Sequence, residues 1–262
     1  MIPGLLAAFE KPTTKDFVWP CWNGGGIGGL GCYNFVFFIV TLAVLSFLLF
    51  FLIAFRRPSV VPGKMQLVAE MGLDFVKQNV ALQMIGPEGM AFFAFLATLF
   101  FYIFFGNIWE VLPGVNFTMN SRIAFPMVLA LISWVVYNTV GIRKHGFLGY
   151  MKMVMFPPGA PAPLYLLLTP IEILTVIIVR PITLSVRLFA NMVAGHFLLA
   201  VFFLATFAFF SSLNGLMMVL GVFSGALAIA LVGFEIFVSG LQAFIFAVLT
   251  ASYIGGALAE EH

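Results

Sequence analysis

Long runs of apolar residues alternate along the chain with short groups of charged residues. Three such runs lie in the first part of the chain: 33–55, the stretch between Glu88 and Glu110, and 123–142. A helix needs about 20 consecutive apolar residues to cross a bilayer. Each run is long enough, so the pattern predicts three transmembrane helices before residue 146.

Basic residues stand at one end of two of these runs. Arg56 and Arg57 follow the first run, and Arg143, Lys144 and His145 follow the third. Loops rich in lysine and arginine remain on the cytoplasmic side of a membrane. Both groups therefore indicate the cytoplasmic side of the membrane. This predicts an external N-terminus and, after five crossings, a cytoplasmic C-terminus.

Two segments between the apolar runs have the mixed composition of helices that lie in the membrane interface. In 64–85, charged residues alternate with an apolar stripe. The stripe consists of Met71, Phe75, Val76 and Leu82. The second segment, 146–162, contains Lys152 and ends in a proline-rich stretch. We expect both segments to lie along the cytoplasmic surface.

The last hundred residues contain two apolar stretches that are longer than a membrane is thick. As helices, 163–210 would extend about 70 Å and 216–258 about 65 Å, against a hydrocarbon core of about 30 Å. A turn at 211–215 separates them. The two helices must break into separate spans or tilt steeply as a hairpin. Pro170 and Pro181 slightly favour breaks, although neighbouring helices can tolerate proline in a membrane.

Composition narrows the class of protein further. Hydrophobic residues make up 63% of the 262 residues and charged residues 8%, against about a quarter charged in a soluble domain. These values exclude soluble, disordered, fibrous and nucleic-acid-binding proteins. The net charge of +2 is too small to indicate a polyanionic partner. We predict an all-α polytopic membrane protein with about five membrane-embedded helices and additional interfacial amphipathic helices.

The pattern divides the chain into three parts: an N-terminal extracytoplasmic segment (1–32), three spans with interfacial helices (33–162) and the long hairpin (163–262). The first part contains both cysteines, Cys21 and Cys32. Two cysteines without histidines nearby do not form a zinc site, and we expect no metal or other cofactor. In an oxidising compartment the two thiols would be able to form a disulfide.

Ionisable residues interrupt the apolar sequence of the last hundred residues. They are Glu172, Arg180, Arg187, His196 and Glu235. A charge at the bilayer centre costs roughly 2.5–3.5 kcal/mol on insertion scales, and such residues as a rule mark ion pathways. The alternative is that the five groups only pair with one another and hold the hairpin together. Five such groups on two neighbouring helices favour an ion pathway.

Helical periodicity assigns these polar residues to faces. In the first long stretch, Arg180, Arg187 and Asn191 share one face, and His196 lies on the opposite face. In the second stretch, one face carries a row of polar residues: Glu235, Ser239, Gln242 and Tyr253. A hairpin with Arg187 level with Gln242 brings His196 and Glu235 within about one helical turn. We therefore hypothesise that these two residues form one proton-exchanging site.

Arg187 cannot relay a proton, because a guanidinium group keeps its proton in proteins. It can act as a fixed positive charge that repels hydronium and favours the ionised form of any carboxylate brought near it. Such a carboxylate would load a proton on one side of Arg187 and release one on the other. No second carboxylate lies at the right place on this chain, so a partner must supply the proton carrier.

Two segments of the hairpin carry a resemblance to a known family: RPITLSVRLFANMVAGH (180–196) and GLQAFIFAVLTASYIGGALAEEH (240–262). Both resemble subunit a of the F-type ATP synthases. Three upstream segments match the family in the same order, namely VPGKMQLVAE (61–70), NIWEVLP (107–113) and TPIEIL (169–174). The resemblance covers roughly 33–262 and is most specific around 180–196.

The resemblance implies a proton-translocating stator subunit that is not catalytic alone. Arg187 matches the essential arginine that faces a rotating ring of c subunits and separates two offset aqueous half-channels. Asn191 and Gln242 match positions beside the arginine and the ring. His196 and Glu235 match a partnered pair, in which some relatives have the acid and the histidine exchanged.

Three further positions match the family. Glu110 and Glu172 match acidic positions associated with the outer half-channel, and Arg180 falls where some relatives have lysine. The family fold implies a long inclined hairpin that wraps the ring. The implied partners are the c-ring subunits, the b subunits of the peripheral stalk, the lipid bilayer and protons, and the implied location is a bacterial plasma membrane.

The residues alone leave two other functions open. A stand-alone proton-coupled transporter would usually show internal repeats and a substrate site at the membrane midplane, and we find no convincing repeat. A structural membrane scaffold would hold its buried charges as inert pairs. Co-purification with many copies of a small apolar subunit would distinguish the stator subunit from both.

Overall fold

The computed structural model describes residues 35–109, 120, 122–156, 165–212 and 214–259, and the regular structure in these residues is entirely helical. The elements in chain order are α2 (Phe35–Ala54), α3 (Lys64–Val76), η3 (Lys77–Leu82), η4 (Pro87–Ala91), α4 (Phe93–Ile108), α5 (Ala124–Met155), α6 (Tyr165–Leu174), η7 (Thr175–Val179), α7 (Arg180–Ser211) and α8 (Gly215–Leu258). The segment 1–32, with both cysteines, and Glu110 lie outside the described residues.

Among the described residues, four helices are long and apolar enough to cross a membrane: α2, α5, the continuous helix Leu167–Ser211 and α8. The apolar helix α4 is shorter, with 16 residues, and extends about 24 Å. These five helices confirm the predicted fold class. The first predicted span, 33–55, agrees with α2 to within two residues at either end.

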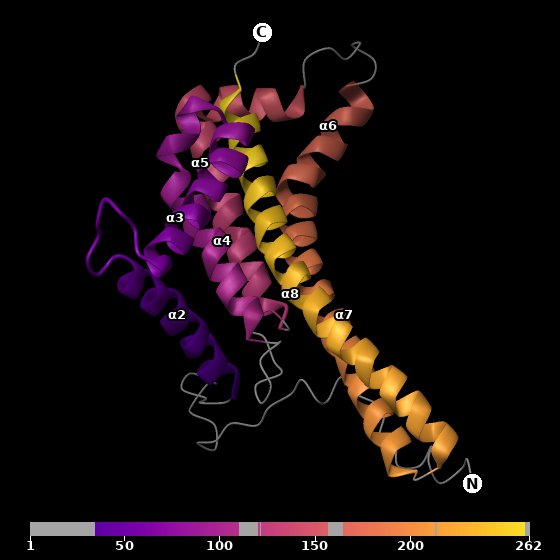
Figure 1. Cartoon of the computed structure of the whole chain (residues 1–262). Helices are drawn as coiled ribbons and strands as arrows, with labels where there is room; N and C mark the ends of the chain where they lie inside the picture. Colours follow the sequence, from indigo (N-terminus) through magenta and orange to yellow (C-terminus); the bar gives the residue numbers. More distant parts are fainter. Residues whose placement is uncertain (1–34, 110–119, 121, 157–164, 213, 260–262) are drawn as a thin grey trace, which may run out of the picture.

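The described parts of the two predicted interfacial segments are also helical, whereas 157–162 lie outside the described residues. Residues 64–85 form α3 and the π-helix η3, which pack on the bundle through Val76 and Val80, both fully buried. The second segment begins at Gly146, whose φ of 72° is accessible to glycine without strain. The chain changes direction at this residue, and the part of α5 that follows runs across the upper end of the bundle (Figure 1).

The expected breaks at Pro170 and Pro181 are absent. The helix continues from Leu167 to Ser211, with Pro170 inside α6 and Pro181 in the first turn of α7. Between the two prolines, the five residues of η7 form a π-helix. The long inclined hairpin implied by the family resemblance is therefore correct, and the local preference for breaks is wrong.

A rearrangement of hydrogen bonds at Val176 explains why the helix tolerates Pro181. The N–H of Arg180 donates to the carbonyl of Thr175 rather than to that of Val176. The next residue, Pro181, has no N–H to offer. Trp134 Nε1 and the Tyr137 hydroxyl donate to the Val176 carbonyl instead, at 2.9 and 3.2 Å. Side chains of α5 thus replace the backbone donor that the proline removes.

Helices α7 and α8 form an antiparallel hairpin whose far half extends beyond the other helices (Figure 1). Two contacts fix its register. The hydroxyl oxygens of Thr206 and Ser224 lie 3.1 Å apart, and Gly195 lies against the side chain of Glu235. The same spacing places Arg187 level with Ala243, one residue from the predicted level at Gln242.

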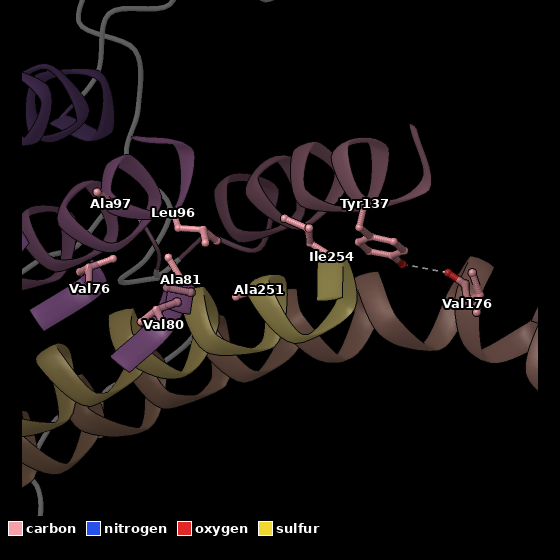
Figure 2. Packing of buried hydrophobic residues seen from close by; sticks show 10 residues of the cluster. Val76, Val80, Ala81, Leu96, Ala97, Tyr137, Val176, Ala251 and Ile254 are labelled. Atoms are coloured by element: carbon pink, nitrogen blue, oxygen red, sulfur yellow. Dashed lines mark hydrogen bonds between the residues drawn. The ribbon is translucent and has the colours of Figure 1, made fainter. Parts of the chain in front are cut away.

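The near half of the hairpin packs against the rest of the chain. Figure 2 shows the main cluster, in which Val76, Val80 and Leu96 meet Ala251 and Ile254 of α8, with Tyr137 at one end. A second cluster lies farther along the same helices and joins Leu99 and Ile103 of α4 to Leu188, Ala243 and Phe246 of the hairpin. Since the α4 numbers rise as the α8 numbers fall, α4 and α8 are antiparallel.

Candidate functional site

Arg187 lies on the exposed face of α7, far from both ends of the helix Leu167–Ser211. Its neighbours on this face, Thr183, Ala190 and Ala194, are also exposed and have small side chains. Within the described part of the chain, Arg187 makes no ion pair. A guanidinium group exposed to lipid at this depth is unfavourable. This face is therefore suited to a partner that approaches closely and carries a negative charge.

Glu235 points the other way, into the hairpin. It is buried, with 4% of its surface exposed, and its carboxylate packs against Gly195 of α7. His196 is the next residue after Gly195, so the structure brings His196 and Glu235 to the same level, as the register predicted. A direct hydrogen bond between the two side chains stays a prediction.

A side chain at position 195 would collide with Glu235, because an added Cβ would overlap the carboxylate. We expect Gly195→Ala to destabilise the purified chain by about 1–3 kcal/mol, the usual cost of overpacking a tight site. Thermal unfolding in detergent measures this change. The matched control is Gly233→Ala, since Gly233 is on α8 with nothing within 4 Å of its added Cβ. An equal loss of stability in both variants would contradict the close packing at Gly195.

Several buried polar atoms without a hydrogen-bond partner lie at or near the level of Glu235 along the hairpin. Among the described residues they include Glu235 Oε1, Ser239 Oγ, Asn191 Nδ2, Asn107 Nδ2 and Asn120 Oδ1. We name these five residues the polar layer. By the register of the hairpin Asn191 lies level with Ser239, and because α4 is antiparallel to α8, Asn107 lies close to the level of Glu235. Buried polar atoms are normally hydrogen-bonded to protein or water, so this layer is suited to holding water.

Asn107 of α4 and Asn120, four residues before α5, complete the polar layer. Asn120 Nδ2 donates to Asn107 Oδ1 at 2.6 Å, and both residues are fully buried. Neither residue is predicted as part of a site from the sequence, because an isolated asparagine beside an apolar run has no periodic pattern. The one signal in the sequence is the amide itself, which is polar at a depth where lipid-facing side chains are apolar.

A second polar region lies at the other end of the hairpin, around Arg180. Its guanidinium group stacks over Tyr253 at 4.8 Å from the ring centre and lies 6.0 Å from that of Tyr137. Cation–π contacts of this kind stabilise a charge away from water. A cavity of about 390 Å³ adjoins Arg180 and is also lined by Glu172, Tyr150 and Tyr253. We name it the Glu172 cavity.

The surroundings of Glu172 show at which end of the bundle it lies. Gly256 and Ala257, at the end of α8, also line the Glu172 cavity, and Lys144 donates to the Leu258 carbonyl nearby. Glu172 thus lies at the end of the bundle that carries the basic cluster after the third span. Glu110 lies outside the described residues, so the expectation that it shares an outer half-channel with Glu172 stays untested, and the position of Glu172 favours the other half-channel.

Arg187 lies between these two polar regions along the hairpin. The polar layer begins at Asn191, about 6 Å farther toward the turn. Arg180 lies about 10 Å in the other direction. Gln242, half-buried on α8, is close to the level of Arg187. The arrangement can therefore provide two separate hydrated regions with one fixed cation between them.

No group of three or more histidine, cysteine, aspartate or glutamate side chains that could hold a metal ion occurs in the described ranges. The last hundred residues contain His196, Glu235 and Glu172, whose side chains can bind and release a proton.

The amino-acid sequence of this chain matches a known protein family and several named proteins. The family model described as ATP synthase A chain matches residues 35–255. The chain is 47% identical over 215 residues to ATP synthase subunit a of Rhodococcus erythropolis, covering 81% of this chain and 78% of the relative. It is 42% identical over 257 residues to ATP synthase subunit a of Frankia alni, covering 97% and 88%. A relative of the same name from Nocardioides is 36% identical over 262 residues, covering 97% and 95%.

Proposed function

The chain belongs to the ATP synthase A chain family, and on that premise we propose that it is the proton-translocating stator subunit of a rotary F-type ATP synthase. In this role it forms two offset half-channels against a ring of c subunits. It performs no catalysis alone, and its output is rotation of the ring coupled to proton flow.

The exposed position of Arg187 is the observation that carries this proposal. A permanent cation on the outer face of a membrane helix requires a carboxylate from outside the chain, because lipid cannot solvate it. The small residues around it, Thr183, Ala190 and Ala194, allow a partner helix to approach closely. A ring of apolar helices, each with one carboxylate, meets both requirements.

The two polar regions supply the half-channels. The polar layer around Glu235 conducts protons between one side of the membrane and the ring, and the Glu172 cavity conducts them between the ring and the other side. Arg187 separates the two, since its charge repels hydronium. Protons can therefore cross only while bound to a ring carboxylate.

Named residues perform the proton transfers in this scheme. His196 and Glu235 exchange protons in the outer half-channel, assisted by the water that Asn107, Asn191 and Ser239 hold. In the other half-channel Glu172 is the proton-binding group, and Arg180, held by Tyr253, keeps the cavity polar. Gln242, beside Arg187, orients the ring carboxylate as it passes. The acidic residue Glu110 would belong to the outer opening.

The basic clusters set the orientation. Arg56 and Arg57 after α2, together with Arg143 and Lys144, place the Glu172 cavity on the cytoplasmic side. The polar layer then faces outward, with the N-terminus outside and the C-terminus in the cytoplasm. The named relatives are bacterial, which supports a multi-pass protein of the bacterial plasma membrane. The b subunits of the peripheral stalk would hold the chain against the turning ring.

Purification from native membranes tests the assignment of partners. We expect the chain to be recovered with many copies of a small, very apolar subunit that has one buried carboxylate, and with b subunits. The control variant is Ala190→Trp, which places a bulky side chain on the exposed face beside Arg187 and should release the small subunit. Recovery of the chain alone, or as a homodimer, would instead support a secondary transporter.

A further inference from the structure

A large cavity lies at the junction of α2 and α3, far from the proton path. Its volume is about 670 Å³, and its lining comes from the end of α2, the link that follows and the first turn of α3. Three cationic side chains line it, namely Arg56, Arg57 and Lys64. The proposed proton-translocating function uses these residues only as a guide to orientation.

The three cations have no acidic partner. None makes an ion pair within the part of the chain that the structure describes, and no acidic residue lines the cavity. The nearest acid along α3, Glu70, accepts a hydrogen bond from Gln66 at 2.7 Å. A cavity with three uncompensated positive charges favours an anionic occupant.

The surroundings of the cavity are apolar rather than polar. Val60 and Val61, in the link between α2 and α3, are almost fully exposed. Met65 of the first turn of α3 is half-exposed and also lines the cavity. Exposed apolar side chains next to cations are typical of protein surfaces at the boundary between headgroups and acyl chains.

A second hollow lies between α2, α3 and α4. It has a volume of about 280 Å³ and is lined by Phe47, Phe51, Leu73, Phe93 and Phe101, with small residues between them. Phe47 and Phe51 share one face of α2 with Ala54, which lines the basic cavity. From Ala54, the last residue of α2, back to Phe47 the helix rises about 10 Å, so the second hollow lies beside the basic cavity and reaches toward the middle of the hydrocarbon core.

We propose that these two hollows form one binding site for an anionic phospholipid. The phosphodiester headgroup binds between Arg56, Arg57 and Lys64, and one acyl chain lies along the phenylalanine-lined groove between α2, α3 and α4. The charge of the upper hollow and the apolar lining of the lower one match the two halves of such a lipid. The site anchors α3 to the end of α2 at the membrane surface.

An acidic protein segment is the main competing occupant of the basic cavity. It would satisfy the three cations but would leave the apolar groove without a matching group. It would also place peptide polar groups against Val60 and Val61, at a cost in desolvation. The closeness of the apolar groove to the basic cavity, one turn apart along α2, therefore favours the lipid.

Lipid retention on the purified full chain tests the site. The chain is exchanged into mixed micelles with equal amounts of phosphatidylglycerol and phosphatidylcholine, and the lipids that remain bound are counted by native mass spectrometry. We expect preferential retention of phosphatidylglycerol. Arg56→Gln/Lys64→Gln should weaken it about twentyfold or more, since each cation near an anionic lipid contributes about a factor of five.

Matched variants separate this site from general charge effects. Arg143→Gln/Lys152→Gln removes one arginine and one lysine that are also exposed but line neither hollow, and it should leave retention unchanged. Ala94→Leu, which narrows the apolar groove, should also reduce retention, whereas Ala91→Leu outside it should not. Equal retention in the two charge variants would overturn the proposal. So would full displacement of the lipid by inorganic phosphate, or a cross-link from Lys64 to an acidic protein segment in the assembled complex.

Discussion

Replacing Arg187 with alanine is expected to abolish ATP-driven proton pumping, by about a hundredfold or more, while ATP hydrolysis by a detached catalytic head continues. Without the guanidinium group, nothing favours the ionised form of the passing carboxylate, and nothing separates the two hydrated regions. Removal of one preorganised electrostatic group commonly costs about 10²–10³ in rate. Acidification of inverted membrane vesicles after addition of ATP measures the pumping.

The control for this prediction is Arg143→Ala, which removes an exposed arginine at the end of the third span. It should leave pumping close to that of the wild type. Normal pumping in Arg187→Ala would contradict the assigned role directly. Loss of pumping in both variants would point to a general requirement for positive charge rather than to the position of Arg187.

The position of Arg187 is the reason to expect loss of pumping in Arg187→Ala. The side chain of Arg187 is exposed on the outer face of α7 and lies between the polar layer and the Glu172 cavity along the hairpin. A cation that only held the hairpin together would instead point toward Glu235, which packs on Gly195 on another side of α7. The geometry therefore argues against the reading in which the hairpin charges are inert pairs.

The register of the hairpin was predictable because two long helices joined by a short turn have little freedom to slide. The sequence placed Arg187 level with Gln242, and the contacts between Gly195 and Glu235 and between Thr206 and Ser224 place it one residue away, at Ala243. The extents of the spans were predictable for a similar reason, because charged residues such as Arg56 and Glu88 mark where apolar sequence ends.

The course of the chain through Pro181 was not predictable from local sequence. The preference for a break follows from the missing N–H of proline, and it would hold in an isolated helix. Here Trp134 and Tyr137, some 40 residues earlier in the chain, donate to the Val176 carbonyl. Only the packing of α5 against η7 supplies these donors.

The contribution of Asn107 and Asn120 to the polar layer was not predictable from the sequence. Both are single amides near the ends of apolar runs, and their contact depends on how the end of α4 meets the residues before α5. The expected side of Glu172 rests on resemblance alone. Its place in a continuous helix that begins at the end of the bundle near Lys144 favours the opposite side.

Exchange of His196 and Glu235 is expected to restore much of the proton flux that either single change removes. His196→Glu alone places two carboxylates at one level of the hairpin, and Glu235→His alone places two histidines there. In each case like groups oppose each other's charged forms. We expect coupled flux to fall about a hundredfold, the low end of the roughly 10²–10⁴-fold range for loss of a proton-transfer group. The exchanged double variant keeps one acid and one histidine. Its flux in reconstituted vesicles should return to within a few-fold of the wild type.

A second double variant decides whether such recovery reflects proton exchange or only relief of crowding. His196→Gln/Glu235→Gln removes both titratable groups but keeps polar side chains of similar size, and it should stay inactive. In the exchanged variant a histidine at 235 must pack against Gly195 where the Glu235 carboxylate packs in the wild type, so thermal stability is measured alongside flux. If it conducts no better than either single variant while retaining wild-type thermal stability, His196 and Glu235 do not act as a pair. Proton transfer through the polar layer would then depend on Glu235 and water alone.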